Sequence, residues 1–212
     1  MDMDYSIYLV TNREVTEKKG RDFYASIEEA LQHGVTLVQL REKNLPDAAV
    51  AEEGRRVKAL CDRYGVPLLV DDRIAVAKAI GAAGVHLGQS DDTLQEARKE
   101  LGKDAIIGIS AHNLAEALAA EKGGADYLGA GALYPTSTKK DATDLSLAEF
   151  RAIVGAVSIP VVGIGGIGIP QYGEVLDCGA AGCAMITSIL GADDIGVAVD
   201  TMKALYRERQ NR

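Results

Sequence analysis

Eight short apolar runs, several of them rich in β-branched residues, recur along the chain, and longer stretches rich in Ala, Glu, Lys and Leu separate them. Such runs predict strands, and the stretches between them are long enough for helices. A regular alternation of strands and helices is typical of a parallel α/β fold, and eight strand–helix units close a barrel. The predicted strands are residues 7–10, 37–40, 67–70, 84–87, 105–109, 127–128, 160–164 and 182–186.

Apolar residues at helical spacing lie between these runs. In residues 26–33, for example, Ile27, Ala30 and Leu31 follow an i, i+3, i+4 pattern. A residue whose side chain accepts a hydrogen bond from the first turn is expected just before or at the start of each helix. The predicted helices are 26–33, 47–64, 114–122, 147–154 and 195–207, with caps at Ser26, Asp47, Asn113, Ser146 and Asp194.

A weak internal repeat accompanies this alternation. Gly34, Gly81, Gly124 and Gly179 each follow a helical stretch and precede an even-numbered strand. Glycine ends helices well because it enters the left-handed backbone region without steric cost. The intervals of 43 to 55 residues correspond to two strand–helix units each. We therefore predict a single (β/α)₈ TIM barrel over residues 1–212, near the lower size limit of that fold. A doubly wound open sheet is the alternative.

Composition narrows the function classes. The net charge of −8 argues against a nucleic acid or a membrane surface as the partner, because both are anionic. Cys61, Cys178 and Cys183 lack the spacing of a zinc site or a disulfide framework, so we expect reduced, buried thiols. The first residues have no features of a signal peptide, and we expect a cytoplasmic protein. The sequence leaves a homo-oligomer open.

In a parallel barrel, residues just after each strand gather at one face, where active sites form. The second strand brings Gln39, Arg41 and Lys43 there, and a guanidinium beside an ammonium suits a diphosphate. The third strand brings Asp71 and Asp72, and Asp91 follows the fourth. One or two carboxylates together with substrate phosphates are typical of a Mg²⁺ site. Solvated ion pairs and helix capping are the structural alternatives for these residues.

A second cluster suggests a binding site for a single phosphate group. The segment Tyr134-Pro135-Thr136-Ser137-Thr138-Lys139-Lys140-Asp141 places three hydroxyl groups directly before two lysines. Such a loop is often only a solvated surface feature, but here the turn Gly163-Ile164-Gly165-Gly166 ends strand seven and Ile186-Thr187 ends strand eight. Loops after strands seven and eight of barrels often bind phosphate. The pattern indicates an enzyme that joins a diphosphate-activated fragment to a phosphorylated acceptor.

Several longer motifs resemble the thiamine phosphate synthase family over nearly the whole chain. They are Tyr8-Leu9-Val10-Thr11, Gln39-Leu40-Arg41-Glu42-Lys43, Asp71-Asp72, Gly84-Val85-His86-Leu87-Gly88-Gln89 with Asp91, residues 108–112, residues 134–139 and residues 163–167. The resemblance implies a (β/α)₈ barrel that joins an aminopyrimidine methyl diphosphate to a thiazole phosphate and releases pyrophosphate. It also implies a Mg²⁺ cofactor and a dissociative mechanism.

The resemblance assigns roles to particular positions. Asp72 and Asp91 would bind Mg²⁺, and Arg41, Lys43, Ser110 and Lys139 would be catalytic. The pyrimidine diphosphate would contact Gln39, Leu40, Arg41, Glu42, Lys43, Asp71, Ser110 and Lys139. The thiazole phosphate would contact Thr136, Ser137, Thr138, Gly166, Ile186 and Thr187.

Asp71 departs from the family pattern, which usually has Asn before the metal-binding Asp. An ionised Asp71 cannot donate a hydrogen bond to a diphosphate. It would contact the metal, be held protonated, or turn to a cation such as Arg73, and we favour the metal. Thr187 in place of Ser and a short 141–147 segment are lesser departures. A thiazole tautomerase of the same fold and a non-catalytic phosphate-ligand sensor are the alternatives. The tautomerase pattern has a histidine where this chain has Ala132.

Overall fold

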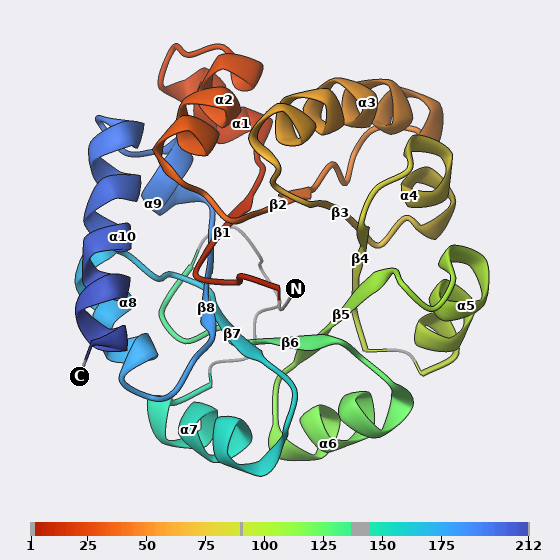
Figure 1. The fold of residues 1–212 in the computed structure, drawn as a ribbon, viewed down its shortest axis with the longest axis vertical. Helices are drawn as coiled ribbons and strands as arrows, with labels where there is room; N and C mark the ends of the chain where they lie inside the picture. Colours follow the sequence, from red (N-terminus) through yellow and green to blue (C-terminus); the bar gives the residue numbers. More distant parts are fainter. Residues whose placement is uncertain (1–2, 90, 137–144, 212) are drawn as a thin grey trace.

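The computed structural model describes residues 3–89, 91–136 and 145–211, and its strands form one closed parallel barrel. Each strand pairs with its sequence neighbours, and β1 pairs with β8 to close the ring (Figure 1). This confirms the (β/α)₈ barrel. The strands are β1 (Ile7–Val10), β2 (Leu37–Leu40), β3 (Leu68–Asp71), β4 (Gly84–Leu87), β5 (Ile106–Ala111), β6 (Tyr127–Ala130), β7 (Val161–Ile164) and β8 (Gly182–Met185).

Helices surround the barrel and cover the outer face of the sheet (Figure 1). Each of the seven crossovers between consecutive strands contains a helix, the usual connection between parallel strands. The helices are α1 (Arg13–Lys18), α2 (Phe23–His33), α3 (Asp47–Tyr64), α4 (Ile74–Ile80), α5 (Asp91–Leu101), α6 (Leu114–Gly123), α7 (Leu147–Ala156), α8 (Ile169–Leu176), α9 (Thr187–Leu190) and α10 (Ile195–Gln210).

The predicted helix caps were right at three positions and wrong at two. Asn113, Ser146 and Asp194 cap α6, α7 and α10 with their side chains. The prediction of Ser26 as a cap was wrong, because α2 begins one turn earlier and Asp22 accepts from Ala25 N–H at 2.8 Å. Asp47 is likewise the first residue of α3 rather than its cap, and Pro46 precedes it.

The repeated glycines have the conformation that the sequence pattern predicted. Gly34, Gly81 and Gly124 are left-handed C-caps with φ of 115°, 64° and 92°. Gly179 has φ of 92° and lies three residues after the end of α8. These helices therefore stop where a side chain would strain the backbone, and the chain turns back into the next strand.

The apolar residues form two cores because successive strand residues point to opposite faces of the sheet. One core lies between the sheet and the helices and includes Leu9, Val38, Val85 and Phe150. The other fills the inside of the barrel with Tyr5, Tyr8, Leu37, Leu69, Tyr127 and Val162. The inner core therefore forms a packed base beneath the carboxyl ends of the strands.

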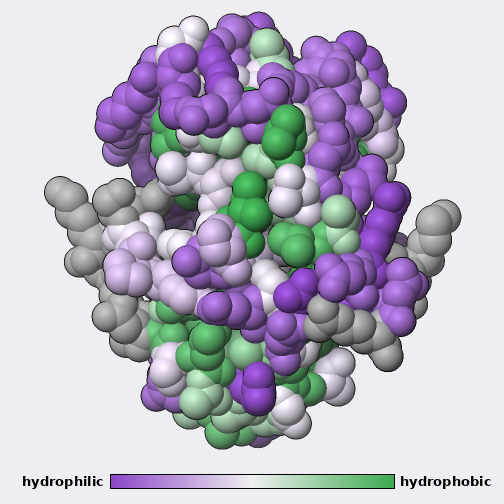
Figure 2. All heavy atoms as spheres, turned by 90° about the vertical axis from the view of Figure 1, so that its left-hand side faces the viewer, coloured by the Kyte–Doolittle hydropathy of each residue, from purple (hydrophilic) through white to green (hydrophobic). Residues whose placement is uncertain are grey.

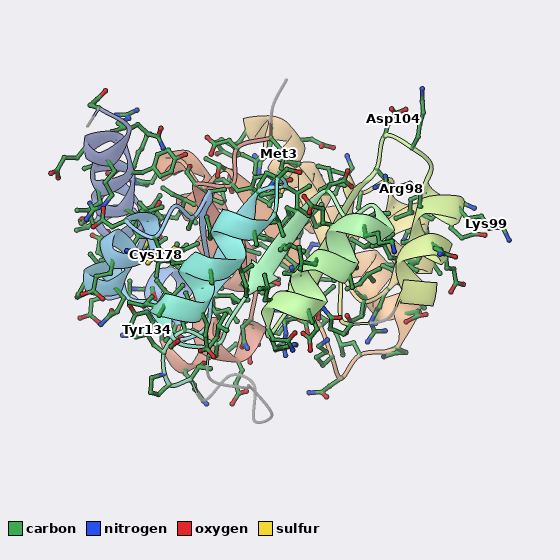
Figure 3. All side chains as sticks on the ribbon, turned by 90° about the horizontal axis from the view of Figure 1, so that it is seen from below. Met3, Arg98, Lys99, Asp104, Tyr134 and Cys178 are labelled. Atoms are coloured by element: carbon green, nitrogen blue, oxygen red, sulfur yellow. The ribbon has the colours of Figure 1, made fainter. Side chains whose placement is uncertain are left out.

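The loops that follow the strands and the loops that precede them lie at opposite ends of the barrel. Tyr134, which follows β6, lies at the opposite end of the barrel from Met3 and Asp104 (Figure 3). On the side formed by α10 and α8, hydrophobic residues form patches among larger hydrophilic areas (Figure 2).

None of the helices in the described part of the chain is long and apolar enough to cross a membrane.

Candidate active site

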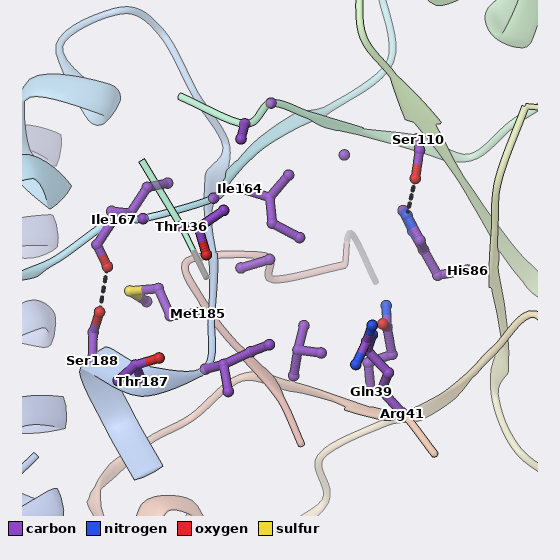
Figure 4. Close-up of a pocket in the computed structure, with 18 of the residues that line it drawn as sticks. Gln39, Arg41, His86, Ser110, Thr136, Ile164, Ile167, Met185, Thr187 and Ser188 are labelled. Atoms are coloured by element: carbon purple, nitrogen blue, oxygen red, sulfur yellow. Dashed lines mark hydrogen bonds between the residues drawn. The ribbon is translucent and has the colours of Figure 1, made fainter. Parts of the chain in front are cut away.

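A cavity of about 540 Å³ lies at the carboxyl ends of the strands (Figure 4). It is the place where the barrel geometry brings together side chains that are far apart in sequence. Most of the predicted site residues in the described part of the chain line it. They are Gln39, Arg41, Lys43, Asp71, Asp72, Ser110, Thr136, Gly166, Ile186 and Thr187.

One side of the cavity is charged. We call Arg41, Lys43, Asp71 and Asp72 the charged wall. The ammonium of Lys43 contacts both carboxylates: it donates a hydrogen bond to Asp72 and lies 2.6 Å from Asp71 Oδ2. Arg41 Nε lies 3.8 Å from the same Asp71 oxygen. The loops after β2 and β3 therefore meet through opposite charges.

The surroundings of these groups change their pKa values. Burial raises the pKa of Asp71 above its ordinary value, and the nearby charges of Lys43 and Arg41 only partly oppose this. Burial by itself would lower the pKa of Lys43, but the two aspartates outweigh it and raise that pKa. Lys43 is therefore a firmly charged cation, and Asp71 is more easily protonated than an ordinary aspartate.

Asp72 has a special backbone conformation. Its φ of 57° lies in the left-handed region, and its N–H donates to the carbonyl of His86 at 2.9 Å. Few residues other than glycine adopt this conformation, although aspartate tolerates it better than most. Its side chain is half exposed, whereas that of Asp71 is about 10% exposed. Two adjacent aspartates thus reach the same ammonium from different depths.

Asp71 turns to Lys43 and Arg41 rather than to Arg73. Arg73 instead pairs with Asp47 and donates to the Glu42 carbonyl at 2.9 Å. Asp71 thus turns to a neighbouring cation, as one of the three alternatives held, but the cations are Lys43 and Arg41 and not Arg73. Asp71 Oδ2 is buried without a well-aligned hydrogen bond, although Lys43 lies close to it. That oxygen retains acceptor capacity for a cation.

The charged wall suits a divalent cation such as Mg²⁺. Its carboxylates already converge on one positive charge, the Lys43 ammonium, and Asp71 has an oxygen to offer. No group of three or more His, Cys, Asp or Glu side chains gathers around a metal position within the described residues. Mg²⁺ commonly needs only one or two carboxylates and takes phosphate oxygens and water as its other ligands. The donor set therefore fits a metal that binds together with a diphosphate.

Two predicted site residues next to this wall face away from the cavity. Leu40 is fully buried in the core between sheet and helices. Glu42 packs against Glu53, and one carboxylate oxygen of each is buried without a hydrogen bond from a described residue. Burial and the neighbouring Glu53 raise the pKa of Glu42 to about 7, and Arg13 and Arg41 oppose this only partly. Both residues support the strand end from behind.

The opposite side of the cavity carries no charged group among its described residues. We call Thr136, Gly165, Gly166, Ile186 and Thr187 the glycine wall. Figure 4 shows Thr136 and Thr187 across the cavity from Gln39 and Arg41. Ser188 donates to the carbonyl of Ile167, which ties the loop after β8 to the loop after β7. Backbone groups and hydroxyls, rather than ion pairs, form this wall.

The two glycines of this wall are required by close packing. Gly165 and Gly166 have φ of 93° and 63°, where other residues are strained. A Cβ on Gly166 would lie 2.5 Å from the carbonyl oxygen of Pro135, and one on Gly165 would lie 2.5 Å from the Cβ of Ala132. The loops after β6 and β7 therefore pack directly against each other at these glycines, and both glycines line the cavity.

The cavity floor contains a polar feature that sequence reasoning missed. His86 donates to or accepts from Tyr127 through Nδ1 at 2.8 Å and contacts Ser110 Oγ through Nε2 at 3.0 Å. The sequence motif that contains His86 gave this residue no separate role. The apolar residues on either side of it, Val85 and Leu87, pack against the helices, and they could have signalled that His86 points into the barrel, because successive strand residues point to opposite faces. His112 also lines the cavity and pairs with Glu116 at 2.9 Å.

Some predicted site residues lie outside the described residues. They are Ser137, Thr138 and Lys139 of the loop after β6, and the side chain of Asp91. Asp91 is the first residue of α5, four residues after Leu87 at the end of β4. The predictions for these residues therefore remain predictions.

Fold and cavity together define a (β/α)₈-barrel protein whose ligand site lies at the carboxyl ends of its strands. Among sequence families, the model described as thiamine monophosphate synthase matches residues 7–189. The chain belongs to this family. The resemblance deduced from the motifs is thus confirmed, and the family is one of transferases.

Individual relatives agree over almost the full length. A thiamine-phosphate synthase of Clostridium acetobutylicum is 52% identical over 194 residues, which is 92% of this chain and 91% of the relative. One of Methanobrevibacter smithii is 42% identical over 210 residues, which is 99% of both chains. The solved structure of thiamine phosphate pyrophosphorylase from Pyrococcus furiosus is 39% identical, covers 97% of both chains and superposes with a TM-score of 0.88.

Proposed function

We propose that the chain is a thiamine phosphate synthase. It would join 4-amino-2-methyl-5-(diphosphooxymethyl)pyrimidine to 4-methyl-5-(2-phosphooxyethyl)thiazole and release pyrophosphate. The observation that carries the proposal is that the charged wall and the glycine wall face each other across one cavity. Such a cavity can hold two phosphorylated ligands with their heterocycles between the walls. The family membership of the chain supports the same reaction.

The charged wall would hold the diphosphate. Arg41 and Lys43 provide a planar and a compact cation, and Lys139 would add a third from the loop after β6. Asp72 and Asp91 would hold Mg²⁺, with Asp71 in direct or water-mediated contact. Bound there, Mg²⁺ would neutralise charge on the leaving pyrophosphate. Lys43 bridges Asp71 and Asp72, and from this position its ammonium would face the diphosphate beside the metal.

The reaction would begin with cleavage of the bond between the methylene carbon and the diphosphate oxygen. The bonding electrons leave with pyrophosphate, whose charge Arg41, Lys43 and Lys139 stabilise. The electron-rich aminopyrimidine stabilises the methylene cation, and Gln39 and Ser110 hold that ring. The lone pair of the thiazole nitrogen then forms the new carbon–nitrogen bond. Proximity of the two heterocycles supplies much of the remaining rate enhancement.

The glycine wall would hold the thiazole phosphate. Gly166 allows the backbone to approach the phosphate closely, and Thr136, Ser137, Thr138 and Thr187 supply hydroxyl groups. Ile186 lines the cavity beside them and offers an apolar contact to the thiazole. A neutral wall of this kind suits a monophosphate, which carries less charge than a diphosphate bound with a metal.

The proposed partners are two small molecules. We propose neither nucleic acid nor a membrane as a partner, because the net charge of −8 would repel both. A cytoplasmic location and a homo-oligomeric assembly remain predictions.

The test is a measurement of pyrophosphate release with each substrate alone and with both together, with and without Mg²⁺. We expect release only when both substrates and Mg²⁺ are present. Binding of both ligands without release would identify a sensor and overturn the proposal. Isomerisation of a thiazole carboxylate phosphate without any pyrimidine would identify the tautomerase instead. Ala132, which lines the cavity where the tautomerase has histidine, argues against that outcome.

A further inference from the structure

A chain of hydrogen bonds crosses the floor of the cavity inside the barrel. Gln39 Nε2 donates to Tyr8 OH at 2.6 Å, and Tyr8 OH lies 2.8 Å from Tyr127 OH. Tyr127 OH lies 2.8 Å from His86 Nδ1, and His86 Nε2 lies 3.0 Å from Ser110 Oγ. The five side chains come from β2, β1, β6, β4 and β5. The chain therefore connects two proposed substrate contacts, Gln39 and Ser110, which lie on different strands.

The chain is buried and closely packed. Tyr8 and Tyr127 are at most 1% exposed, Gln39 is 4% and His86 is 8%. The Tyr127 ring contacts the rings of Tyr5 and His86, with centroid distances of 4.8 Å and 5.5 Å. Burial raises the pKa of both Tyr8 and Tyr127 above the ordinary value, so both hydroxyls retain their hydrogens. Buried polar groups of this kind are costly unless they are paired, and here they pair with one another.

Two glycines inside strands make room for the chain. A Cβ on Gly108 would lie 2.1 Å from the Tyr127 ring, and one on Gly129 would lie 2.9 Å from the His86 ring. Gly108 pairs with both His86 and Tyr127 in the sheet register. Glycine weakens a strand interior, and it commonly marks a place where another group approaches closely. Here those groups are the two rings at the centre of the hydrogen-bond chain.

The first link sets the direction of the others. An amide nitrogen can only donate, so Tyr8 OH accepts from Gln39. Tyr127 OH is the other hydrogen-bond partner of the buried Tyr8 hydroxyl among the described residues, so pairing every buried hydrogen requires Tyr8 to donate to Tyr127. Tyr127 OH then donates to His86 Nδ1, which must be unprotonated to accept. The ring hydrogen of His86 lies on Nε2 and is donated to Ser110 Oγ. The hydrogen of Ser110 is left to point into the cavity, while Gln39 keeps its Oε1 as an acceptor.

We propose that Tyr8, Tyr127 and His86 are positioning residues that form a one-way hydrogen-bond chain, which makes the Ser110 hydroxyl a donor toward the pyrimidine. The inference rests on the proposed function and deepens it. The two ends of the chain, an acceptor at Gln39 and a donor at Ser110, suit a heterocycle with an amino hydrogen and an unprotonated ring nitrogen. An aminopyrimidine has both.

The first test reads the His86 tautomer in the ligand-free full chain by nitrogen NMR. The measurement is made at about pH 8, above the ordinary imidazole pKa of about 6.5. The His86→Gln variant, which loses the signals, assigns them. We expect hydrogen on Nε2 in the wild type and a detectable loss of this preference in Tyr127→Phe. A wild type with hydrogen on Nδ1 would overturn the proposal, because Ser110 would then donate to His86.

The second test compares kinetics of two matched variants. Tyr127→Phe removes one hydroxyl from the chain, and Tyr172→Phe removes a buried hydroxyl that donates to the Ser6 carbonyl at 2.9 Å outside it. We expect Tyr127→Phe to lower kcat/KM for the pyrimidine diphosphate about tenfold, roughly the effect of one well-placed hydrogen bond. KM for the thiazole phosphate should stay unchanged, and Tyr172→Phe should behave like the wild type. Equal kinetics of the two variants would overturn the proposal.

Two further arms keep the test decisive. If Tyr127→Phe does not fold, Tyr8→Phe removes the hydroxyl that orients Tyr127 but leaves the Tyr127–His86 contact, so we expect a smaller loss of kcat/KM and of the tautomer preference in the same direction, and no change in either would overturn the proposal. If the wild type releases no pyrophosphate, the proposed function fails. The tautomer measurement needs no substrate and still confirms or overturns the hydrogen-bond chain in that case.

Discussion

The two walls of the cavity solve the problem of binding anions in different ways. The charged wall uses side chains, with Lys43 held between Asp71 and Asp72. The glycine wall uses backbone geometry, with Gly165 and Gly166 in left-handed conformations against the loop after β6. Anion binding at the charged wall depends on the charges of its side chains and on the ion pairs they form. Anion binding at the glycine wall depends on glycines, which leave the backbone accessible. The two should therefore respond differently to mutation, metal and pH.

The largest effect should come from removing the central cation of the charged wall. Lys43→Ala should lower kcat about a hundredfold or more, because a charge aimed at a developing anion is lost. It would also leave Asp71 and Asp72 facing each other without their shared ammonium. The control is Lys58→Ala, which removes only an exposed pair with Asp62 on α3. Similar steady-state rates for both variants would show that Lys43 is a surface cation.

The second largest effect should be on the Mg²⁺ requirement, which only the charged wall should influence. Asp72→Asn should raise the Mg²⁺ concentration for half-maximal activity at least about tenfold, because a carboxylate ligand is lost. Asp62→Asn, on the outer side of α3, should leave the titration unchanged. A Mg²⁺ titration of both variants checks this. If Asp72→Asn titrates like the wild type, Asp72 serves only the Lys43 pair.

A change on the glycine wall should leave the metal requirement alone. Gly166→Ala places a Cβ 2.5 Å from the Pro135 carbonyl oxygen at a φ of 63°, and we expect a roughly tenfold higher KM for the thiazole phosphate. Gly20→Ala is the control, because φ is 68° there and no atom lies within 4 Å of the new Cβ. Gly20→Ala should lower the free energy of unfolding by about 1–2 kcal/mol, the cost of a left-handed L-residue, and Gly166→Ala should lower it by more because its Cβ also clashes with the Pro135 carbonyl. Equal KM values would indicate that the glycine is needed for backbone conformation alone.

The smallest effect concerns how the free energy of unfolding changes with pH, and it should come from Glu42, which lies behind the charged wall. Burial beside Glu53 raises the pKa of Glu42 to about 7 in the folded protein, from an ordinary value near 4.5. The folded state thus binds more protons, so this contribution to stability is complete below about pH 4.5 and is lost as pH rises through 7. Glu42→Gln should make the fall in unfolding free energy between pH 5 and 8 shallower.

Glu100→Gln is the matched control for that measurement. The pKa of Glu100 is lowered by its contact with Lys78, so it titrates below this pH range and its removal should not change the slope. Chemical denaturation at several pH values measures both variants. An unchanged slope in Glu42→Gln would mean that Glu42 is ionised throughout the range. Burial also raises the pKa of Asp71, so the stability contribution of Asp71 changes with pH in the same direction.

The sequence predicted most of the fold, because strand and helix signals are local. Strands β1, β2 and β4 have the predicted bounds, and the other strands differ by one or two residues at an end. The errors at Ser26 and Asp47 concern which of several capping residues the helix uses, which depends on where the preceding loop enters. Five helices, α1, α4, α5, α8 and α9, were not among those predicted. For α1 and α9 the reason is that four to six residues carry too little periodicity.

The sequence also identified which residues follow each strand, and hence most of the cavity lining. It could not show that Glu42 turns from the cavity to Glu53, or that Asp71 chooses Lys43 over Arg73. Those outcomes depend on which partner lies within reach after the loops have packed. Each outcome is set by the interaction of two residues that lie on different elements and are far apart in the sequence.

The sequence by itself determined the order of the elements, the number of strands and the family of the chain. Hydrophobic periodicity, glycine helix ends and short motifs are all properties of neighbouring residues. Only the tertiary structure decided that Tyr8 and Tyr127, 119 residues apart, share a hydrogen bond beneath the cavity. Closing the barrel brings their strands' inner faces together, and no local pattern specifies which inner side chains then meet.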